Sequence, residues 1–245
     1  MRLCSWILLI GYTAIMVSVD LANLHAPPVI VVPATKMTLD DYRAWVYSDD
    51  FPERGRVTFV NGRVIIDMSP ERYDLHVAIK ESLNSTLGPL VRQFDRGRYY
   101  PDGGLITNAT AGVSNEPDAL FATWETLESG ALAPPAGSVN DDRYMELVGA
   151  PDWVCEIVSD SSVEKDTKHL RAAYHKAGIR EYWLIDARGE AIDFQLLVRA
   201  DGGYQGAPLV DGWAYSPVFE REFRLTRERD RLGRCKYGLH HRPRD

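Results

Sequence analysis

Cysteine is scarce in this chain of 245 residues, and its spacing argues against two classes of structure. The three cysteines are Cys4, Cys155 and Cys235, and they form neither a Cys-x-x-Cys pair nor a Cys/His cluster. Structural zinc sites need such clusters, and small secreted scaffolds need several paired cysteines. The sequence therefore predicts neither a zinc site nor a disulfide framework, and it fits a reducing compartment.

An excess of positive charge is also lacking. The formal net charge is -7 at pH 7, which does not favour a protein that coats nucleic acid. The charge is uneven, because the segment from Phe219 to the end carries +4. We expect this tail to be a solvated helix or a frayed end; the alternative is a small patch that contacts phosphate groups. Internal repeats and low-complexity segments are absent from the sequence.

Only one long hydrophobic run is present, from Leu3 to Val19. Its length is marginal for a membrane-spanning helix and suits the apolar region of a signal peptide or a short anchor. Two other interpretations are an unstructured leader and a true translation start at Met37, and either would leave the protein in the cytoplasm. We favour these two over an exported or membrane-anchored protein. With residues 26–33 as an extended linker, the expected divisions are 1–36, 37–200 and 201–245.

What the chain does contain is a clear strand–helix–strand unit in residues 150–186. Residues 153–158 form a short apolar run of β-formers, and a Ser-Asp-Ser-Ser turn follows. Residues 163–176 have helical spacing, Gly178 stands at the expected C-cap, and residues 181–186 form a second apolar strand. Two apolar strands joined through a helix predict a parallel pair buried beneath helices.

Glu156 is the anomaly in this unit, because it lies inside the first apolar strand. An unpaired carboxylate is costly to bury there. Three interpretations remain open from the residues alone. The side chain reaches solvent, pairs with an arginine, or holds a metal ion.

The clearest local signal is a hairpin over residues 56–67, with Asn61-Gly62 as its turn. A capping box at Thr38 predicts a short helix through Trp45. Ser69-Pro70-Glu71 predicts the start of a second helix that runs to about Leu87. His76 and Lys80 lie beside the apolar stripe of that helix, where a histidine is most often a packing residue. The remaining expected strands are residues 105–107, 119–122, 191–199 and 214–219, and residues 129–142 are expected to be a loop.

In combination these segments resemble a known family. The motifs are Asn61-Gly62-Arg63, Met68-Ser69-Pro70, His76, Pro117-Asp118, Pro151-Asp152, Glu156-Ile157-Val158-Ser159, Asp166, Tyr174 and Gly178-Ile179-Arg180-Glu181-Tyr182-Trp183. Over roughly residues 37–199 the chain resembles the Uma-two family of restriction-endonuclease-like proteins, in the PD-(D/E)XK nuclease superfamily. The resemblance implies an α/β fold with a restriction-endonuclease-like mixed central β-sheet flanked by helices.

The resemblance also implies a metal-dependent site that hydrolyses phosphodiester bonds, with DNA as the substrate. Asp118 would match the first acid of the family and Glu156 the second. Both would bind Mg²⁺ or Mn²⁺, together with the backbone carbonyl of Ile157. Hard divalent cations prefer oxygen ligands and lower the pKa of bound water, so these residue types suit that chemistry. No organic cofactor is expected, and a homodimer is expected only by analogy with enzymes that cut two strands.

The lysine of the site departs from the superfamily pattern. The usual place is two residues after the second acid, where this chain has Val158. The family carries its lysine on the next helix instead, at a place that Leu170 occupies here. Lys168 is two residues early, about 200° around a helix, and we assign it the catalytic role; Lys165 fits less well. An acid before the Asn-Gly turn is also replaced, by Thr58.

Two functions follow as alternatives. One is a metal-dependent endonuclease with Asp118, Glu156 and Lys168 as catalytic residues. The other is a catalytically inactive protein of the same fold that binds nucleic acid or a protein partner, which the position of Lys168, the presence of Thr58 and the acidic net charge would favour.

Overall fold

The structure is a computed structural model, and it describes residues 3–10, 13–20, 29–33, 37–52, 55–102, 104–137 and 144–244. For the first three of these ranges it describes the backbone alone. No helix among the described residues is both long enough and apolar enough to cross a membrane.

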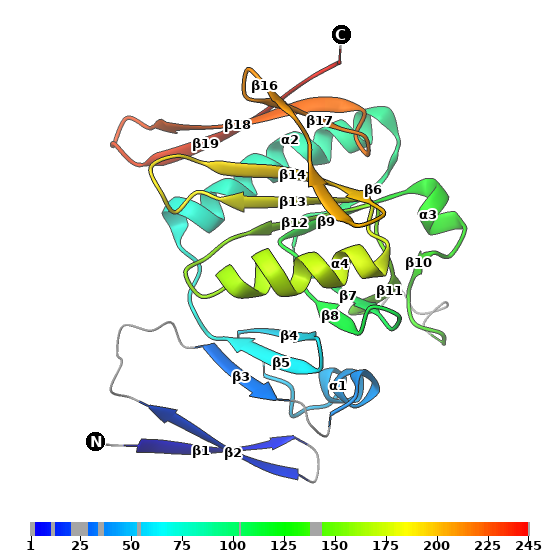
Figure 1. The fold of residues 1–245 in the computed structure, drawn as a ribbon, viewed down its shortest axis with the longest axis vertical. Helices are drawn as coiled ribbons and strands as arrows, with labels where there is room; N and C mark the ends of the chain where they lie inside the picture. The colour runs from blue at the N-terminus through cyan, green and yellow to red at the C-terminus, as the bar shows by residue number, and fades with distance from the viewer. Residues whose placement is uncertain are drawn as a thin grey trace.

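The centre of the molecule is a six-stranded mixed sheet (Figure 1). Its strands in spatial order are β15 (Gly203–Gly206), β14 (Asp193–Ala200), β13 (Glu181–Asp186), β12 (Trp153–Ile157), β9 (Ala119–Thr123) and β6 (Gly97–Tyr100). β12 and β13 are parallel, and all the other neighbours are antiparallel. The predicted parallel pair is therefore confirmed.

A seven-stranded sheet contributes the second layer of strands. Its order is β10 (Leu132–Ala133), β11 (Glu146–Gly149), β7 (Leu105–Asn108), β8 (Val113–Asn115), β4 (Arg56–Val60), β5 (Arg63–Asp67) and β3 (Val29–Pro33). The expected linker over residues 26–33 is wrong for residues 29–33, because this β-branched run pairs with β5; residues 26–28 lie outside the described residues. Part of the apolar run near the N-terminus forms a hairpin of β1 (Leu3–Ile10) and β2 (Thr13–Asp20).

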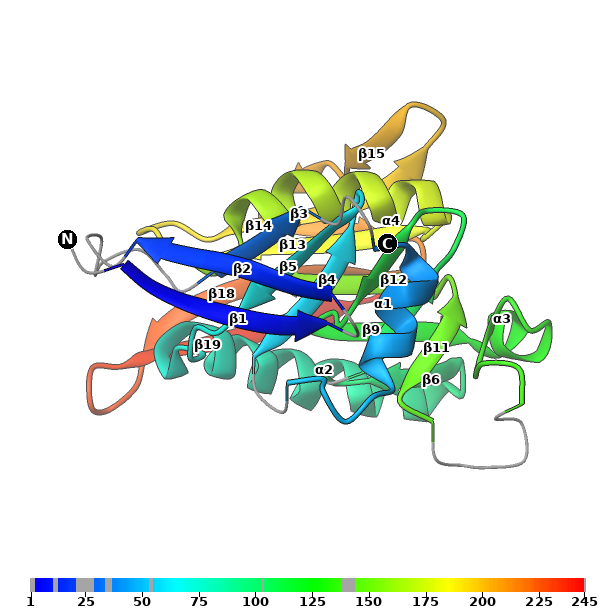
Figure 2. The same cartoon turned by 90° about the horizontal axis from the view of Figure 1, so that it is seen from below.

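Helices cover both faces of the central sheet, as Figure 2 shows for α2 and α4. The α-helices are α1 (Leu39–Val46), α2 (Ala78–Phe94), α3 (Trp124–Glu128) and α4 (Arg171–Ala177). One hydrophobic cluster joins α2 to Trp153 and Trp183 of the sheet, and a second joins α4 to Val154 and Tyr182. The alternation of these strand residues explains why both faces need a helix. A mixed sheet flanked by helices is confirmed.

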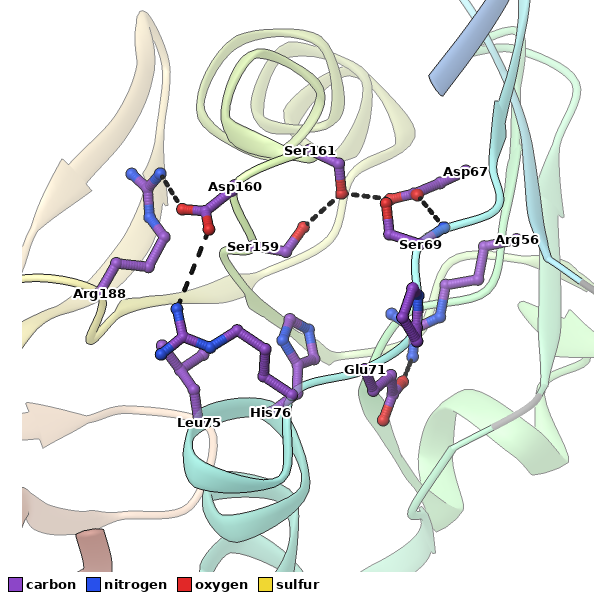
Figure 3. Close-up of a pocket in the computed structure, with 12 residues that line it drawn as sticks. Arg56, Asp67, Ser69, Glu71, Leu75, His76, Ser159, Asp160, Ser161 and Arg188 are labelled. Atoms are coloured by element: carbon purple, nitrogen blue, oxygen red, sulfur yellow. Dashed lines mark hydrogen bonds and ion pairs between the residues drawn. The ribbon is translucent and has the colours of Figure 1, made fainter. Parts of the chain in front are cut away.

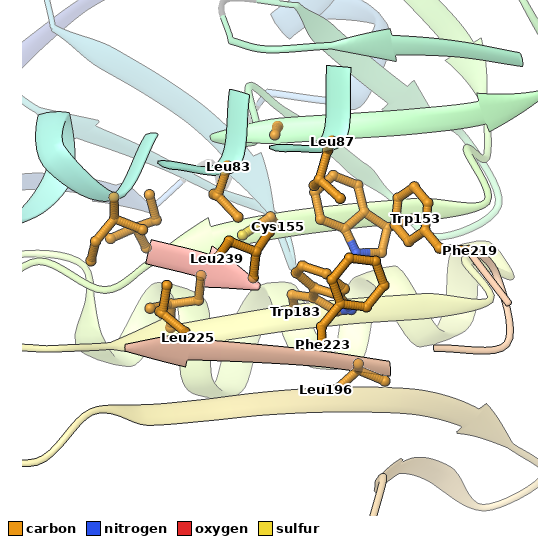
Figure 4. Close-up of a cluster of buried hydrophobic side chains, with 14 of the residues drawn as sticks. Leu83, Leu87, Trp153, Cys155, Trp183, Leu196, Phe219, Phe223, Leu225 and Leu239 are labelled. Carbon is orange, nitrogen blue, oxygen red and sulfur yellow. The ribbon is translucent and has the colours of Figure 1, made fainter. Parts of the chain in front are cut away.

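Aromatic side chains fill the cluster on the α2 side (Figure 4). The rings of Trp153 and Trp183 meet edge to face with centroids 5.1 Å apart, and Trp183 meets Phe223 in the same way at 4.9 Å. Such contacts add roughly 0.5–1.5 kcal/mol to the area that the rings bury. They hold the parallel strands against the C-terminal part of the chain.

The C-terminal tail is not the expected solvated helix or frayed end. It forms β18 (Arg221–Arg229) and β19 (Cys235–Arg242), in a four-stranded sheet with β16 (Leu209–Val210) and β17 (Trp213–Ser216). Apolar residues alternate with charged ones in both long strands, and Phe223, Leu225, Tyr237 and Leu239 are buried in the α2 cluster. The charge of the tail therefore lies on one face of a sheet whose other face is part of the core.

Two helices contain π-helical turns. The first, η1 (Tyr73–Val77), leads into α2, and the Val77 amide donates to the carbonyl of Arg72, five residues back, at 3.2 Å. The second, η2 (Lys165–Leu170), leads into α4. The helix expected with Ser69 as its cap begins three residues later than predicted, because the Ser69 amide donates to Asp67 Oδ1 (2.8 Å) in a local turn. The apolar stripe at Leu75, Ile79, Leu83 and Leu87 is confirmed as buried.

The predicted hairpin is confirmed, and its turn gives a testable result. Asn61 and Gly62 both have positive φ, 52° and 67°, as a type I′ turn requires. We expect Asn61→Ala to lower the free energy of unfolding by about 1 kcal/mol, since alanine adopts this conformation reluctantly. Asn61→Gly removes the same side chain without that conformational cost. Its midpoint of urea denaturation should therefore be higher than that of the alanine variant. Equal midpoints for the two variants would show that the turn conformation does not matter.

Candidate active site

The pairing of β9 with β12 brings Asp118 and Glu156 together. Ala119 lies opposite Cys155 in this antiparallel pair, so the next residues in register are Asp118 and Glu156, whose side chains share one face of the sheet. Both residues are 1% exposed. They line a common cavity of about 20 Å³ together with Ile157, which is space for roughly one water molecule or ion.

Asp118 is surrounded by donors. The backbone amide of Ile157 donates to its Oδ2 at 2.7 Å. Arg56 Nη1 lies 2.9 Å and Lys80 Nζ 3.2 Å from Oδ1, and His76 Nε2 lies 3.6 Å from Oδ2. Burial alone would raise the pKa of this carboxyl, but the nearby His76 imidazole and the charges of Arg56 and Lys80 outweigh it and hold the pKa well below its usual range. Asp118 is therefore ionised.

Glu156 has a contrasting environment. Its Oε1 accepts hydrogen bonds from Tyr174 Oη (2.5 Å) and Asn115 Nδ2 (2.9 Å). Thr58 Oγ1 in turn donates to Asn115 Oδ1 at 2.5 Å. Burial is the largest influence on Glu156 and, against the opposing charge of Lys165, raises its pKa to about 8. The interpretation that Glu156 reaches solvent is wrong.

Lys165, and not Lys168, lies at these carboxylates. Lys165 Nζ is 3.9 Å from Glu156 Oε2 and 2.9 Å from Asp166 Oδ1, and its side chain is 11% exposed. The side chain of Lys168 is 73% exposed and points to Glu164, with 3.9 Å between Nζ and Oε1. Lys168 does not line the cavity that contains Asp118 and Glu156.

Both π-helical turns border the cavity. η1 carries His76, and η2 carries Lys165 and Asp166. A π-helical turn contains more residues than an α-helical turn, so side chains beyond it are rotated relative to α-helical spacing. Single turns of this kind occur frequently at functional sites. The π-helical turns therefore help to explain how His76, Lys165 and Asp166 come to face the cavity.

The donor set of the cavity is compatible with a hard divalent cation. Among the residues that the structure describes, no three His, Cys, Asp or Glu side chains form a group that could hold a metal ion. Asp118 and Glu156 nevertheless both line the cavity. Such cations commonly use one or two carboxylates and complete their coordination with water and substrate. Five acidic side chains share three permanent cations here: Glu71, Asp102, Asp118, Glu156 and Asp166 with Arg56, Lys80 and Lys165. An additional positive charge would therefore be compensated.

A wider cavity of about 260 Å³ adjoins the acidic one (Figure 3). Arg56, Asp67, His76 and Ser159 line both cavities. In Figure 3, Ser159 and Ser161 connect through hydrogen bonds to Asp67, with 2.9 Å between the two hydroxyls and 2.6 Å from Ser161 Oγ to Asp67 Oδ2. The wide cavity thus gives access to the side of the site that contains the carboxylates.

Several residues around the acids were not predicted from the sequence. Arg56 and Asn115 were missed, and Tyr174 was named only among the motifs of the family resemblance. His76 and Lys80 were identified beside the apolar stripe of their helix, but they were not predicted to contact the acids. Their spacing of four residues places them on one helix face, and this was the signal that could have connected them.

Comparison with known proteins gives two results. The model of the Uma2 family, described as "Putative restriction endonuclease", matches residues 39–228. A crystal structure described as "a putative nuclease belonging to DUF820 from Anabaena variabilis" superposes with a TM-score of 0.51 at 21% identity, covering 75% of this chain and 90% of that chain. At this identity the likeness concerns the fold. No curated protein matches the chain.

Proposed function

This chain belongs to the Uma2 family, and on that premise we propose that it is a metal-dependent endonuclease that hydrolyses phosphodiester bonds of DNA. One observation carries the proposal. The carboxylates of Asp118 and Glu156 line one small cavity, and the ammonium group of Lys165 lies 3.9 Å from Glu156. Carboxylates are ligands that suit Mg²⁺ or Mn²⁺, and a nearby ammonium group suits the negative charge of a phosphodiester.

The side chains have separate roles in this proposal. Asp118 stays ionised through Arg56 and Lys80, and its position is fixed by the amide of Ile157. Asn115 and Tyr174 orient Glu156. Lys165 takes the role that the sequence had assigned to Lys168. Its pKa is raised, because the charges of Asp166 and Glu156 outweigh the effect of burial, so it offers a permanent positive charge to the phosphate.

Asp118 and Glu156, with the carbonyl of Ile157, would hold Mg²⁺ or Mn²⁺. When bound, the ion would supply an activated water molecule and stabilise negative charge on the phosphate oxygens. The protein contributes a rigid acidic pair, a nearby lysine and an adjoining cavity large enough for part of a substrate. A homodimer would let two such sites act on both strands.

A titration with Mn²⁺ tests the metal site. We expect wild type to bind one Mn²⁺ per site in calorimetry, and Glu156→Gln and Asp118→Asn to bind at least about tenfold more weakly, since each removes a carboxylate ligand. Lys168→Ala is the matched control and should bind as wild type does. Equal binding by all four proteins would exclude this pair as the metal site.

Incubation of plasmid DNA with Mn²⁺ tests the activity itself, and EDTA should abolish cleavage. The alternative function makes a different forecast. A catalytically inactive protein would bind DNA in a mobility-shift assay and leave the plasmid intact under every metal condition.

A further inference from the structure

The wide cavity contains an anion position that the nuclease proposal does not use. Asp160 lies at its wall with a side chain that is 66% exposed, and two arginines reach it. Arg188 Nη1 is 3.3 Å from Asp160 Oδ1, and Arg72 Nη1 is 3.9 Å from Oδ2. The Arg188 contact is visible in Figure 3. Arg72 precedes η1 and Arg188 follows β13, so the carboxylate connects two separate parts of the fold.

Both arginines are anchored in the same manner. Arg72 donates from Nε and Nη2 to Asp74, at 3.1 and 2.7 Å. Arg188 donates from Nε and Nη2 to Asp186, at 2.9 and 2.8 Å. In each case a neighbouring acid holds one edge of the guanidinium group, and Nη1 remains directed at Asp160. Two guanidinium groups held in this way form a preorganised site for an anion with several oxygens.

Asp160 is a weakly held occupant of that position. Its side chain is 66% exposed, its pair with the exposed Arg72 is long at 3.9 Å, and ion pairs of so exposed a carboxylate contribute little. A phosphate group offers more acceptor oxygens and more charge to the same two nitrogen atoms. Exchange of the carboxylate for a phosphate would therefore cost little and would gain charge-assisted hydrogen bonds.

The rest of the cavity is suited to a nucleotide. Leu75 and Pro70 supply apolar surface, and Ser159 and Ser161 supply hydroxyl groups. The volume of about 260 Å³ is slightly below the roughly 300 Å³ at which pockets begin to enclose drug-sized ligands, so we expect it to take a ligand no larger than about one nucleotide. The shared wall at Arg56, Asp67, His76 and Ser159 places that nucleotide next to the acidic cavity.

We propose that the wide cavity binds the single nucleotide adjoining the bond to be cut, with its phosphate between Arg72 and Arg188 in place of the Asp160 carboxylate. That this nucleotide adjoins the bond to be cut rests on the proposed function. Binding of the nucleotide itself requires neither a metal ion nor cleavage. It assigns recognition of one unpaired nucleotide to residues outside the acidic cavity.

Calorimetric titration of the full chain with thymidine 3′,5′-bisphosphate in EDTA, at low ionic strength, tests the proposal. We expect Arg72→Ala and Arg188→Ala to weaken binding about tenfold each, as expected for loss of a charge-assisted hydrogen bond. Asp160→Asn should tighten binding, because it removes the competing charge. Arg92→Ala, an exposed arginine on α2 that lines neither cavity, is the matched control and should bind as wild type does.

Three results would overturn the proposal. The first is absence of binding by wild type. The second is equal binding by all variants, or weaker binding by Asp160→Asn. The third is equal affinity for the bisphosphate and for thymidine or inorganic phosphate, which would remove the phosphate or the nucleoside from the recognition. If the expected series is obtained while DNA stays uncut with Mn²⁺, the cavity assignment stands and the nuclease proposal fails.

Discussion

Replacement of Lys165 is expected to slow Mn²⁺-dependent DNA cleavage by about 100- to 1,000-fold, the usual cost of removing one preorganised donor to a developing charge. Lys168→Ala should cleave at the wild-type rate. The two variants should differ because Lys165 Nζ lies close to Glu156, whereas Lys168 is exposed beside Glu164. Rates of plasmid nicking under single-turnover conditions measure both variants.

Lys165 also neutralises a buried acid, so its replacement needs a control for folding. Lys165→Met leaves Asp166 without its cation, and a broken buried pair can cost about 3–5 kcal/mol of stability. The double variant Lys165→Met/Asp166→Asn removes both charges and should remain folded while showing the same loss of rate. A double variant that is folded, binds Mn²⁺ and cleaves normally would exclude Lys165 as the catalytic lysine.

Glu181 gives the second large effect, on stability. This carboxylate is fully buried at the start of β13, where it joins the central sheet to the segment after β17. Ser216 Oγ donates to both of its oxygens (2.7 and 2.9 Å), Trp183 Nε1 donates to Oε1 (2.5 Å) and the Val218 amide to Oε2 (3.2 Å). Burial nevertheless dominates these hydrogen bonds and raises the pKa of Glu181 to about 7.

The raised pKa of Glu181 determines how the stability of the fold changes with pH. The folded protein holds the Glu181 proton more tightly than the unfolded chain, whose glutamate pKa is about 4.3. The corresponding stability is fully present below that value and is lost as the pH rises through about 7. The whole loss amounts to roughly 4 kcal/mol, since each pKa unit corresponds to about 1.4 kcal/mol, and roughly 3 kcal/mol of it falls above pH 5. Urea denaturation between pH 5 and 8.5 measures it.

Glu181→Gln is the control for this effect. Glutamine cannot ionise, so the variant should lose less stability than wild type over the same pH range. Its stability at pH 5 should be lower than that of wild type, because the glutamine NH₂ group is a poor acceptor for the hydrogen bond from the Val218 amide. Glu156, with its pKa of about 8, contributes a similar loss to both proteins and cancels in the comparison. Parallel curves for wild type and variant would contradict the assignment to Glu181.

Local signals made part of the fold predictable. The capping box at Thr38 and the Asn61-Gly62 turn each depend on neighbouring residues, and both are found as expected. β8, with Asn115, and the long strands β18 and β19 were missed. β8 also pairs with the distant strand β4, and β18 and β19 cover a core surface formed by α2 and the central sheet, so the contacts that bury them are distant in the sequence. The alternation of apolar and charged residues in β18 and β19 was the local signal that the charge of the tail obscured.

The candidate site was predictable to a different extent. Family resemblance selected Asp118 and Glu156, which register then places side by side. Nothing local connects Arg56 to these acids, because β4 is far from both of them in the chain. Asn115 lies close to Asp118 in the sequence, but the acid that it contacts is the distant Glu156. The lysine was assigned with α-helical geometry, and the π-helical turn over residues 165–170 makes that geometry unsuitable.

This turn has a consequence for the comparison of related sequences. A π-helical turn is equivalent to one extra residue inserted into an α-helix, and here it lies between Lys165 and Tyr174, which both contact Glu156. An alignment that counts a fixed interval across this segment will consequently displace the side chains beyond the turn in any homologue that differs in this insertion. The count of residues between the lysine and the tyrosine should separate homologues into two groups.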